Sequence, residues 1–433
     1  MNSTLEIDRH AERHELPELQ VANGHRVCSL NTSVREVSAE QTLAKIEPIL
    51  ADFGVSSVIN ISLPDVDACP VYQVTRADMR SDYFNAGKGF TPVESKVSGL
   101  MEAIEVQCFE RADPMLLVPR YPLPEHLSQW SLVSAEQLVN PRGQFHCAAR
   151  ERQGGPLVKG HNLNKQESIL LPAEALFLEA DGIVYKSASP NGIASGNSVD
   201  EASCHALCEM LERHALNKFF LSGGRQAIER VRPPGDASRL HLCLDQLADK
   251  NINAEFILIS TEADVAVFIC FLDVPMAGGR RGAVQGYGAH HAPLIAMHRA
   301  LAEAIQILAL CPVSGNHDGG HDGEHVVITS KQAAMLEPHM IAKQRHHDHL
   351  MLQNLRSQLP LVEFEYMALF DLADEQGEEQ LGNESFHTNL DKLLVGLRVM
   401  GIENVYSAVI SPESLPVVVV KCFCPGLTCI DGL

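Results

Sequence analysis

The chain is predicted to adopt a mixed α/β (α+β) fold, in which helices and sheets surround a buried polar site. Three observations lead to this prediction. Apolar helical stretches alternate with short β-branched runs such as 55–63, 70–75 and 417–422. Three of the helical stretches carry acidic side chains on otherwise apolar surfaces. The length of 433 residues, 45% of them hydrophobic, is enough for a large core with subdomains.

The N-terminal region is predicted to contain an arm, a helix and two strands. Residues 1–27 mix acids, bases and histidines without a period, so we expect a flexible N-terminal arm ahead of one domain over 28–433. Ser38 followed by Gln41 has the form of a capping box and begins a helix predicted over 39–53. Gly54 ends this helix, and strands are predicted over 55–63 and 70–75.

The stretch from Asn191 to Arg213 is predicted to be a largely buried helix. Its polar residues Glu201, His205 and Glu209 recur at i, i+4 and i+8, and Glu212 follows at i+11. At roughly 100° per residue these positions form one narrow stripe among apolar neighbours. Because unpaired carboxylates out of water cost on the order of several kcal/mol each, the stripe should face cations or basic partners.

The same spacing recurs in two other helical stretches. Residues at i, i+4 and i+7 are Ser98, Glu102 and Glu105 in one of them, and Arg299, Glu303 and Gln306 in the other. A single acidic stripe is usually a solvated helix face, and this alternative stays open for each helix alone. Three such stripes with few bases at i+4 favour a shared cavity.

A cluster of glutamates without a Cys or His ligand set indicates hard divalent cations rather than zinc. Mg²⁺ prefers oxygen ligands and commonly bridges carboxylates to phosphates, so Mg-ATP is the predicted ligand. Lys88, within the glycine-rich segment 85–90, could meet a phosphate, although a plain turn is an equal alternative.

These residues resemble the signatures of the YcaO family, which uses ATP and Mg²⁺ to activate backbone amides. The first signature, a serine followed by ExxER, matches Ser98, Glu102 and Glu105, with Val106 in place of the arginine. The third, RALxEAxQ, matches Arg299, Glu303 and Gln306 with the intervening residues.

The central signature matches NGIASGN at 191–197 and then Glu201, Glu209, Glu212 and Arg213. His205 replaces a frequent glutamine, and the family's upstream serine aligns with Ala194 or Ser195. The segment from Arg35 to Thr42 resembles the basic residue and hydroxyl that contact nucleotide in the family. The resemblance covers about 33–429 and implies a YcaO-type catalytic domain around a buried Mg-ATP site.

The resemblance also implies roles for individual residues. The residues expected to hold Mg²⁺ are Glu102, Glu105, Glu201, Glu209 and Glu212. Those expected to bind the nucleotide are Arg35, Thr42, Lys88, Ser98, Glu102, Glu201, Glu209, Arg299 and Glu303. The expected catalytic residues are Arg299, Glu303 and Arg213.

Downstream of the central helix, 254–274 is predicted to form paired strands, and Gly278 and Gly279 are predicted to make the turn that follows them. A mobile surface loop is expected near 314–326. A helix over 389–400 and strands over 405–410 and 417–422 follow. The 12 cysteines are scattered and are expected to be free thiols in the core or in turns rather than metal ligands.

The formal net charge of −21 and the lack of a basic stripe argue against a nucleic-acid partner. No signal segment is present, and no run approaches the roughly 18 apolar residues of a membrane span, so a cytoplasmic protein without a membrane partner is expected.

The resemblance implies ATP-dependent phosphorylation of a peptide carbonyl oxygen, giving a thioamide or an azoline. The chain stops at Leu433 without the proline-rich tail common in azoline-forming members, which slightly favours a thioamide. A peptide or protein substrate, a separate substrate- or sulfur-delivery protein and a homodimer are expected. A non-catalytic nucleotide- or peptide-binding scaffold and another Mg-ATP phosphotransfer enzyme remain the alternatives.

Overall fold

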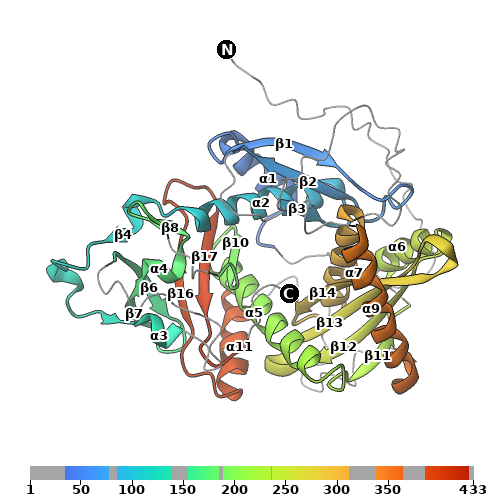
Figure 1. The fold of residues 1–433 in the computed structure, drawn as a ribbon. Coiled ribbons are helices and arrows are strands. Elements are labelled where there is room, and N and C mark those ends of the chain that lie inside the picture. Colours follow the sequence, from blue (N-terminus) through green and yellow to red (C-terminus); the bar gives the residue numbers. More distant parts are fainter. Residues whose placement is uncertain are drawn as a thin grey trace, which may run out of the picture.

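Two large sheets with helix α5 between them organise the protein (Figure 1). The structure is a computed structural model that describes residues 35–77, 85–138, 155–184, 189–235, 237–311, 338–363 and 386–428. The arm expected over 1–27 and the loop expected near 314–326 lie outside these residues.

The five-stranded sheet has the order β14-β13-β12-β11-β15. Its strands are β11 (Glu229–Arg232), β12 (Asn253–Ser260), β13 (Ala266–Pro275), β14 (Arg281–His290) and β15 (Leu361–Glu363). The predicted pairing over 254–274 is confirmed, because β12 and β13 pair antiparallel with Phe256 opposite Cys270.

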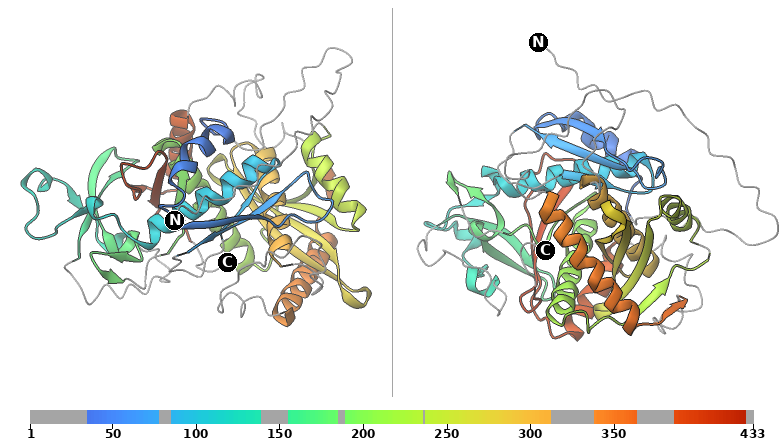
Figure 2. Two further views of the ribbon diagram at one scale, coloured as in Figure 1. Left: turned by 90° about the horizontal axis from the view of Figure 1, so that it is seen from above. Right: turned by 45° about the vertical axis from the view of Figure 1, so that its right-hand side comes forward.

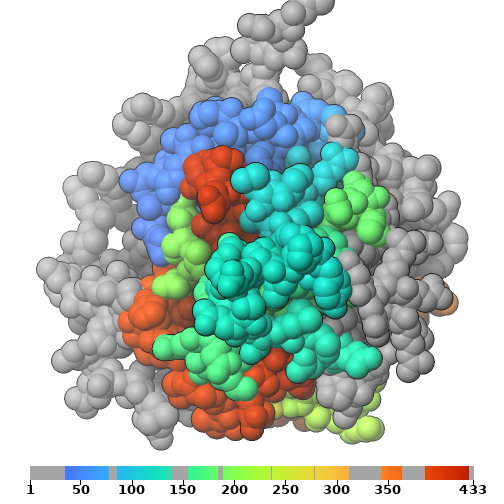
Figure 3. All heavy atoms as spheres, turned by 90° about the vertical axis from the view of Figure 1, so that its left-hand side faces the viewer, coloured from blue at the N-terminus to red at the C-terminus, as the bar shows by residue number. Residues whose placement is uncertain are grey.

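The seven-stranded sheet has the order β10-β17-β16-β6-β7-β5, with β4 paired to β6. Its strands are β4 (Leu117–Val118), β5 (Ser131–Leu132), β6 (Leu157–Asn162), β7 (Glu167–Pro172), β10 (Ile193–Gly196), β16 (Tyr406–Val409) and β17 (Val418–Phe423). The predicted C-terminal strands are thus confirmed as β16 and β17. Strands β4 to β7 build a lobe that projects from the body, and Figure 3 shows it end-on with the C-terminal segment in red beside it.

A three-stranded sheet of β1 (Val55–Asn60), β2 (Val71–Arg76) and β3 (Asn85–Lys88) covers helix α2 (Pro92–Glu110), as both views in Figure 2 show. A small pair, β8 (Glu179–Ala180) with β9 (Ile183–Val184), completes the described sheets. The other described helices are α1 (Ala39–Ile46), α3 (Ala135–Leu138), α4 (Ala173–Leu176), α5 (Val199–Leu221), α6 (Ser238–Asp249), α7 (Pro293–Leu310), α9 (Pro338–Gln358) and α11 (Phe386–Val399).

Helix α5 is buried on most of its circumference, as its sequence predicts. It packs with α11 and the face of β12–β14 that carries Ile257 and Ile269, and with Val420 and Cys422 of β17. The other face of the five-stranded sheet is covered by α6 and α7. Cysteines of this core, including Cys204, Cys208, Cys422 and Cys424, are buried free thiols, as predicted.

Three elements differ most clearly from the predictions. The helix predicted from Asn191 begins only after Ser198, because Gly192 has a positive φ of 80° and Ile193–Gly196 pairs with β17 as strand β10. Helix α1 ends at Ile46 rather than at 53, since Pro48 follows in a 3₁₀ turn. The glycine-rich segment 85–90 contains strand β3 rather than a plain turn.

Glycines let helices α2 and α7 lie directly on strands β3 and β14. A Cβ added at Gly87 of β3 would come within 1.8 Å of the Ser95 carbonyl oxygen of α2. A Cβ on Gly286 or Gly288 of β14 would come within 2.1 Å of backbone atoms of Ala304 or Ala296 in α7. Close backbone approach at these points therefore fixes the position of both helices.

Helix α7 is the described helix whose length and composition would suffice to cross a membrane. However, 67% of its apolar window is buried inside the protein, against β13 and β14. This burial is typical of a core helix.

We predict that Gly286→Ala destabilises the protein by about 1–3 kcal/mol, because the added methyl group has no space beside the α7 backbone. Urea unfolding would measure the change. Gly235→Ala is the matched control, since its Cβ meets nothing within 4 Å and should leave stability nearly unchanged. Equal stability of the two variants would contradict the close packing of α7 on β14.

Candidate active site

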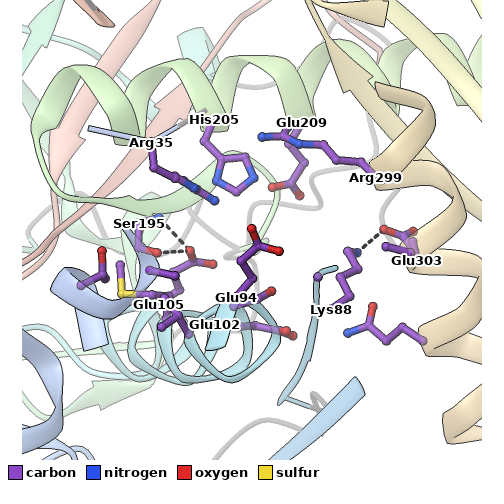
Figure 4. Close-up of a pocket in the computed structure, with 18 of the residues that line it drawn as sticks. Arg35, Lys88, Glu94, Glu102, Glu105, Ser195, His205, Glu209, Arg299 and Glu303 are labelled. Carbon is purple, nitrogen blue, oxygen red and sulfur yellow. Dashed lines mark hydrogen bonds and ion pairs between the residues drawn. The ribbon is translucent and has the colours of Figure 1, made fainter. Parts of the chain in front are cut away.

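A cavity of about 970 Å³ lies where α2, α5, α7, β3 and the segment before α1 meet. The three polar stripes predicted from spacing all face it (Figure 4). The cavity is lined by every predicted site residue: Arg35, Thr42, Lys88, Ser98, Glu102, Glu105, Glu201, Glu209, Glu212, Arg213, Arg299 and Glu303. The structure therefore brings these residues together, while their individual roles toward ligands stay predictions.

Glu201 ties the segment before α1 to the N-terminus of α5. Its Oε1 accepts from Arg35 Nη1 at 3.1 Å and its Oε2 accepts from the Glu36 amide at 3.1 Å. Asn197 Nδ2 donates to the same carboxylate at 3.2 Å. With its side chain only 2% exposed, Glu201 is held by protein donors and is the least available of the predicted metal ligands.

Asn197 is a site residue that the predictions leave out. Its Oδ1 accepts from Thr42 Oγ1 at 3.2 Å and from Lys45 Nζ at 3.1 Å, so it joins α1 to the start of α5. The signal was present in the sequence, since Asn197 ends the NGIASGN motif directly before the cap residue Ser198.

Ser195, rather than Ala194, is the serine that belongs to the site. The Ser195 amide donates to Glu105 Oε1 at 2.7 Å, and its hydroxyl donates to the same oxygen. Ala194 packs instead in the apolar core around α5. Because residues of a strand alternate between faces, β10 can orient only one of these neighbours toward Glu105.

Cations approach the carboxylates from β3, α5 and α7. Lys88 Nζ lies 2.5 Å from Glu303 Oε2, and Arg213 Nε lies 4.0 Å from Glu209 Oε1. Arg299 Nη1 donates to the Ala289 carbonyl at 3.1 Å, which anchors its guanidinium at the end of β14. In the part of the chain that the structure describes, carboxylates outnumber the basic groups around this cavity.

The excess of buried acid raises the pKa values of the glutamates. Burial, and then the charge of Glu105, raises the pKa of Glu102 to about 8. Burial raises the pKa of Glu105 to about 7, opposed by its hydrogen bonds from Ser195. Burial and the charge of Glu303 raise the pKa of Glu212 to about 7, and burial also raises the pKa of Glu209. At neutral pH, all of these glutamates would therefore be ionised only if further positive charge, such as a bound cation, lay near them.

The carboxylate oxygens of the cavity are suitable ligands for Mg²⁺, but the protein does not by itself supply a complete set of ligands. Among the described residues, no three His, Cys, Asp or Glu side chains converge into a ready coordination group. Whether the five predicted glutamates hold Mg²⁺, directly or through water, stays a prediction. Mg²⁺ is commonly held by one or two carboxylates together with phosphate oxygens and waters, which this arrangement allows.

Two further cavity residues carry no predicted role. Glu94, at the start of α2, points into the cavity, and its Oε2 accepts from the Phe90 amide at 2.9 Å (Figure 4). It lies four residues before Ser98 and extends the same stripe by one helical turn, so the spacing was a signal that the predictions did not use. Val106 lines the cavity in place of the signature arginine, and nothing in the structure explains the replacement.

The raised pKa of Glu102 predicts a pH-dependent stability difference. A carboxyl whose folded-state pKa rises from 4.5 to about 8 favours folding below pH 4.5 and loses that contribution as pH rises through about 8. Without nucleotide or metal, Glu102→Gln should match the wild type near pH 4.5 and exceed its thermal stability increasingly up to about pH 8.

Melting temperatures measured across this pH range would check the prediction. The exposed substitution Glu125→Gln is the control and should show no such trend. A Glu102→Gln protein whose stability difference is independent of pH would contradict the burial of an ionisable Glu102.

Comparison with known proteins shows which family this chain resembles. The family model described as YcaO cyclodehydratase, ATP- and Mg²⁺-binding, matches residues 86–428. An uncharacterized protein in the tfuA 3′ region of Rhizobium leguminosarum bv. trifolii is 29% identical over an alignment of 305 residues, and the match covers 66% of this chain and 68% of the relative.

Two solved structures share the fold. YcaO from Methanopyrus kandleri, bound with AMPPCP and Mg²⁺, superposes with a TM-score of 0.65 at 19% identity, covering 93% of this chain and 94% of its own. A heterocyclase in complex with substrate and cofactor gives a TM-score of 0.64 at 17% identity, covering 91% of this chain and 53% of its own. The predicted cofactors, ATP and Mg²⁺, are those named for the matching family. Since the family model spans most of the sequence, the chain belongs to the YcaO family.

Proposed function

We propose that this protein uses ATP and Mg²⁺ to activate a backbone amide of a peptide by phosphorylating the carbonyl oxygen. The observation that carries the proposal is the single cavity in which glutamates of α2 and α5 face Lys88, Arg213 and Arg299. Such a surface suits a polyanionic ligand bridged by hard cations. Membership of the YcaO family supports the same reaction class.

The reaction requires two bond-forming steps. A nucleophile adds to the carbonyl carbon and loses its proton, and the resulting oxyanion attacks the γ-phosphorus of ATP as the bond to ADP breaks. Loss of phosphate then carries away the former carbonyl oxygen, and the amide nitrogen, for an azoline, or the added sulfur, for a thioamide, releases its proton as the new double bond forms. Bound Mg²⁺ would supply charge neutralisation for the phosphates.

The chain's own residues supply position and charge. The Arg299 guanidinium is anchored to the Ala289 carbonyl and Arg213 lies beside Glu209, so both present fixed positive charge to a transferring phosphoryl group. Lys88, paired with Glu303, adds a third cation from the β3 side. No covalent nucleophile on the enzyme is required, because positioning and electrostatic stabilisation account for most of phosphoryl-transfer catalysis.

The nucleophile determines the product. A neighbouring Cys, Ser or Thr side chain of the peptide would give an azoline, and an external sulfide would give a thioamide. We include both in the proposal, together with a separate protein that delivers the peptide or the sulfur. The cavity supports the shared activation step and favours neither product.

The test uses pooled synthetic peptides containing Cys, Ser and Thr, with ¹⁸O in their backbone carbonyl groups, incubated with ATP, Mg²⁺ and, in one arm, sulfide. We expect peptide-dependent phosphate release and ¹⁸O in the released phosphate. The peptide should lose the mass of one water, or gain the mass difference between sulfur and oxygen. Glu209→Gln should slow phosphate release by at least about tenfold, and Glu125→Gln should not.

Each alternative gives a different result. A kinase would transfer the phosphoryl group to a peptide that retains its ¹⁸O. A scaffold would release no phosphate with any peptide. Either outcome would contradict the proposed amide activation.

A further inference from the structure

His205 is the polar residue of the α5 stripe to which the proposed function gives no role. It lies one helical turn after Glu201 and one turn before Glu209 on the cavity face of α5. Figure 4 shows its ring pointing into the cavity, with Arg35 on one side and Glu209 and Arg299 on the other. The glutamates of α2 lie opposite.

The ring has hydrogen-bonding capacity that the protein does not use. In the described part of the chain, His205 Nδ1 is buried and has no hydrogen-bond partner. Leaving a buried polar atom unpaired is unfavourable, so such atoms are usually paired with protein, water or a ligand. An unpaired nitrogen on a cavity wall indicates that its partner is a molecule bound in the cavity.

The charges around the ring indicate which kind of molecule this is. Burial, and then the positive charges of Arg35, Arg299 and Lys88, lower the pKa of His205 well below its usual range, so the free protein carries a neutral imidazole. Burial, and then the charge of Arg35, also lowers the pKa of Arg299. The two guanidinium groups thus lie on either side of a neutral imidazole. Although Arg35 is paired with Glu201 and glutamates line the rest of the cavity, an anion placed between the two guanidinium groups would interact favourably with both.

We propose that His205 donates a hydrogen bond from Nδ1 to a phosphate oxygen of the nucleotide, between the guanidinium groups of Arg35 and Arg299. This contact rests on the proposed function, since it requires the cavity to hold a nucleoside triphosphate. A phosphate chain matches the site because it carries several negative oxygens that accept hydrogen bonds from imidazole and guanidinium donors together.

A purely structural role for His205 makes an opposite prediction about stability. If the ring only filled space, its replacement would destabilise the free protein. A ligand-binding nitrogen left unpaired instead costs stability in the free protein, so His205→Leu should melt at the same temperature as the wild type or higher. This measurement separates the two roles before any ligand is added.

The binding test uses three probes with Mg²⁺ present: AMPPCP, inorganic tripolyphosphate and adenosine. His205→Leu should weaken binding of AMPPCP and of tripolyphosphate by about tenfold, because it removes a hydrogen bond to a charged group. Adenosine binding, followed by saturation-transfer NMR, should not change. His205→Asn places an amide near the position of Nδ1 and should restore most of the lost affinity, and the exposed substitution His346→Ala is the control.

The outcomes are distinguishable. A wild-type protein that binds AMPPCP while His205→Leu binds it equally well would overturn the phosphate contact alone. An equal loss for adenosine and AMPPCP would assign the effect to packing and would also overturn it. A wild-type protein that binds neither AMPPCP nor tripolyphosphate would overturn the nucleotide site itself, and the contact with it.

Discussion

The structure depends on keeping carboxylates inside an apolar enclosure without enough positive charge to balance them. Glu102, Glu105, Glu209 and Glu212 all have raised pKa values, with burial as the first cause. Lys88, Arg213 and Arg299 offset part of the negative charge. The remaining imbalance costs the free protein stability and gives the site its affinity for cations that a polyphosphate can bring.

The fold maintains this imbalance by fixing where the helices lie. Helix α5 is packed between two sheets, which leaves its polar stripe no direction except the cavity. Helices α2 and α7 are set by glycines at which strand and helix backbones nearly touch, Gly87 and Gly286 among them. Carboxylates on such rigid elements stay at the cavity wall, where protonation or a bound cation would offset their mutual repulsion.

Much of this arrangement could be predicted from the sequence because it is periodic. Spacing alone placed Glu102, Glu209 and Glu303 on one face of each helix, and the structure shows those faces meeting. The start of α5 could not be predicted in this way. The pairing of Ile193–Gly196 with β17, more than 220 residues later, overrides the local helical pattern.

The residues that the predictions missed left different signals in the sequence. Asn197 acts through contacts to α1, which are long-range and leave no period in the sequence. Glu94, in contrast, continues the α2 stripe one turn before Ser98, so its spacing could have revealed it. His205 was visible in its stripe, but only the structure shows that its Nδ1 has no partner among the described residues and that Arg35 and Arg299 lie beside it.

Proton release on ligand binding tests the central claim most directly. Calorimetric titration of AMPPCP with Mg²⁺, at about pH 7 in two buffers of different ionisation enthalpy, counts the protons that the glutamates lose when cations enter. The pKa values of about 7 and 8 for Glu105, Glu212 and Glu102 predict a net release that disappears at about pH 9.5, where these groups are already ionised. Binding that releases no protons at about pH 7, or that is equally tight without Mg²⁺, would contradict the account.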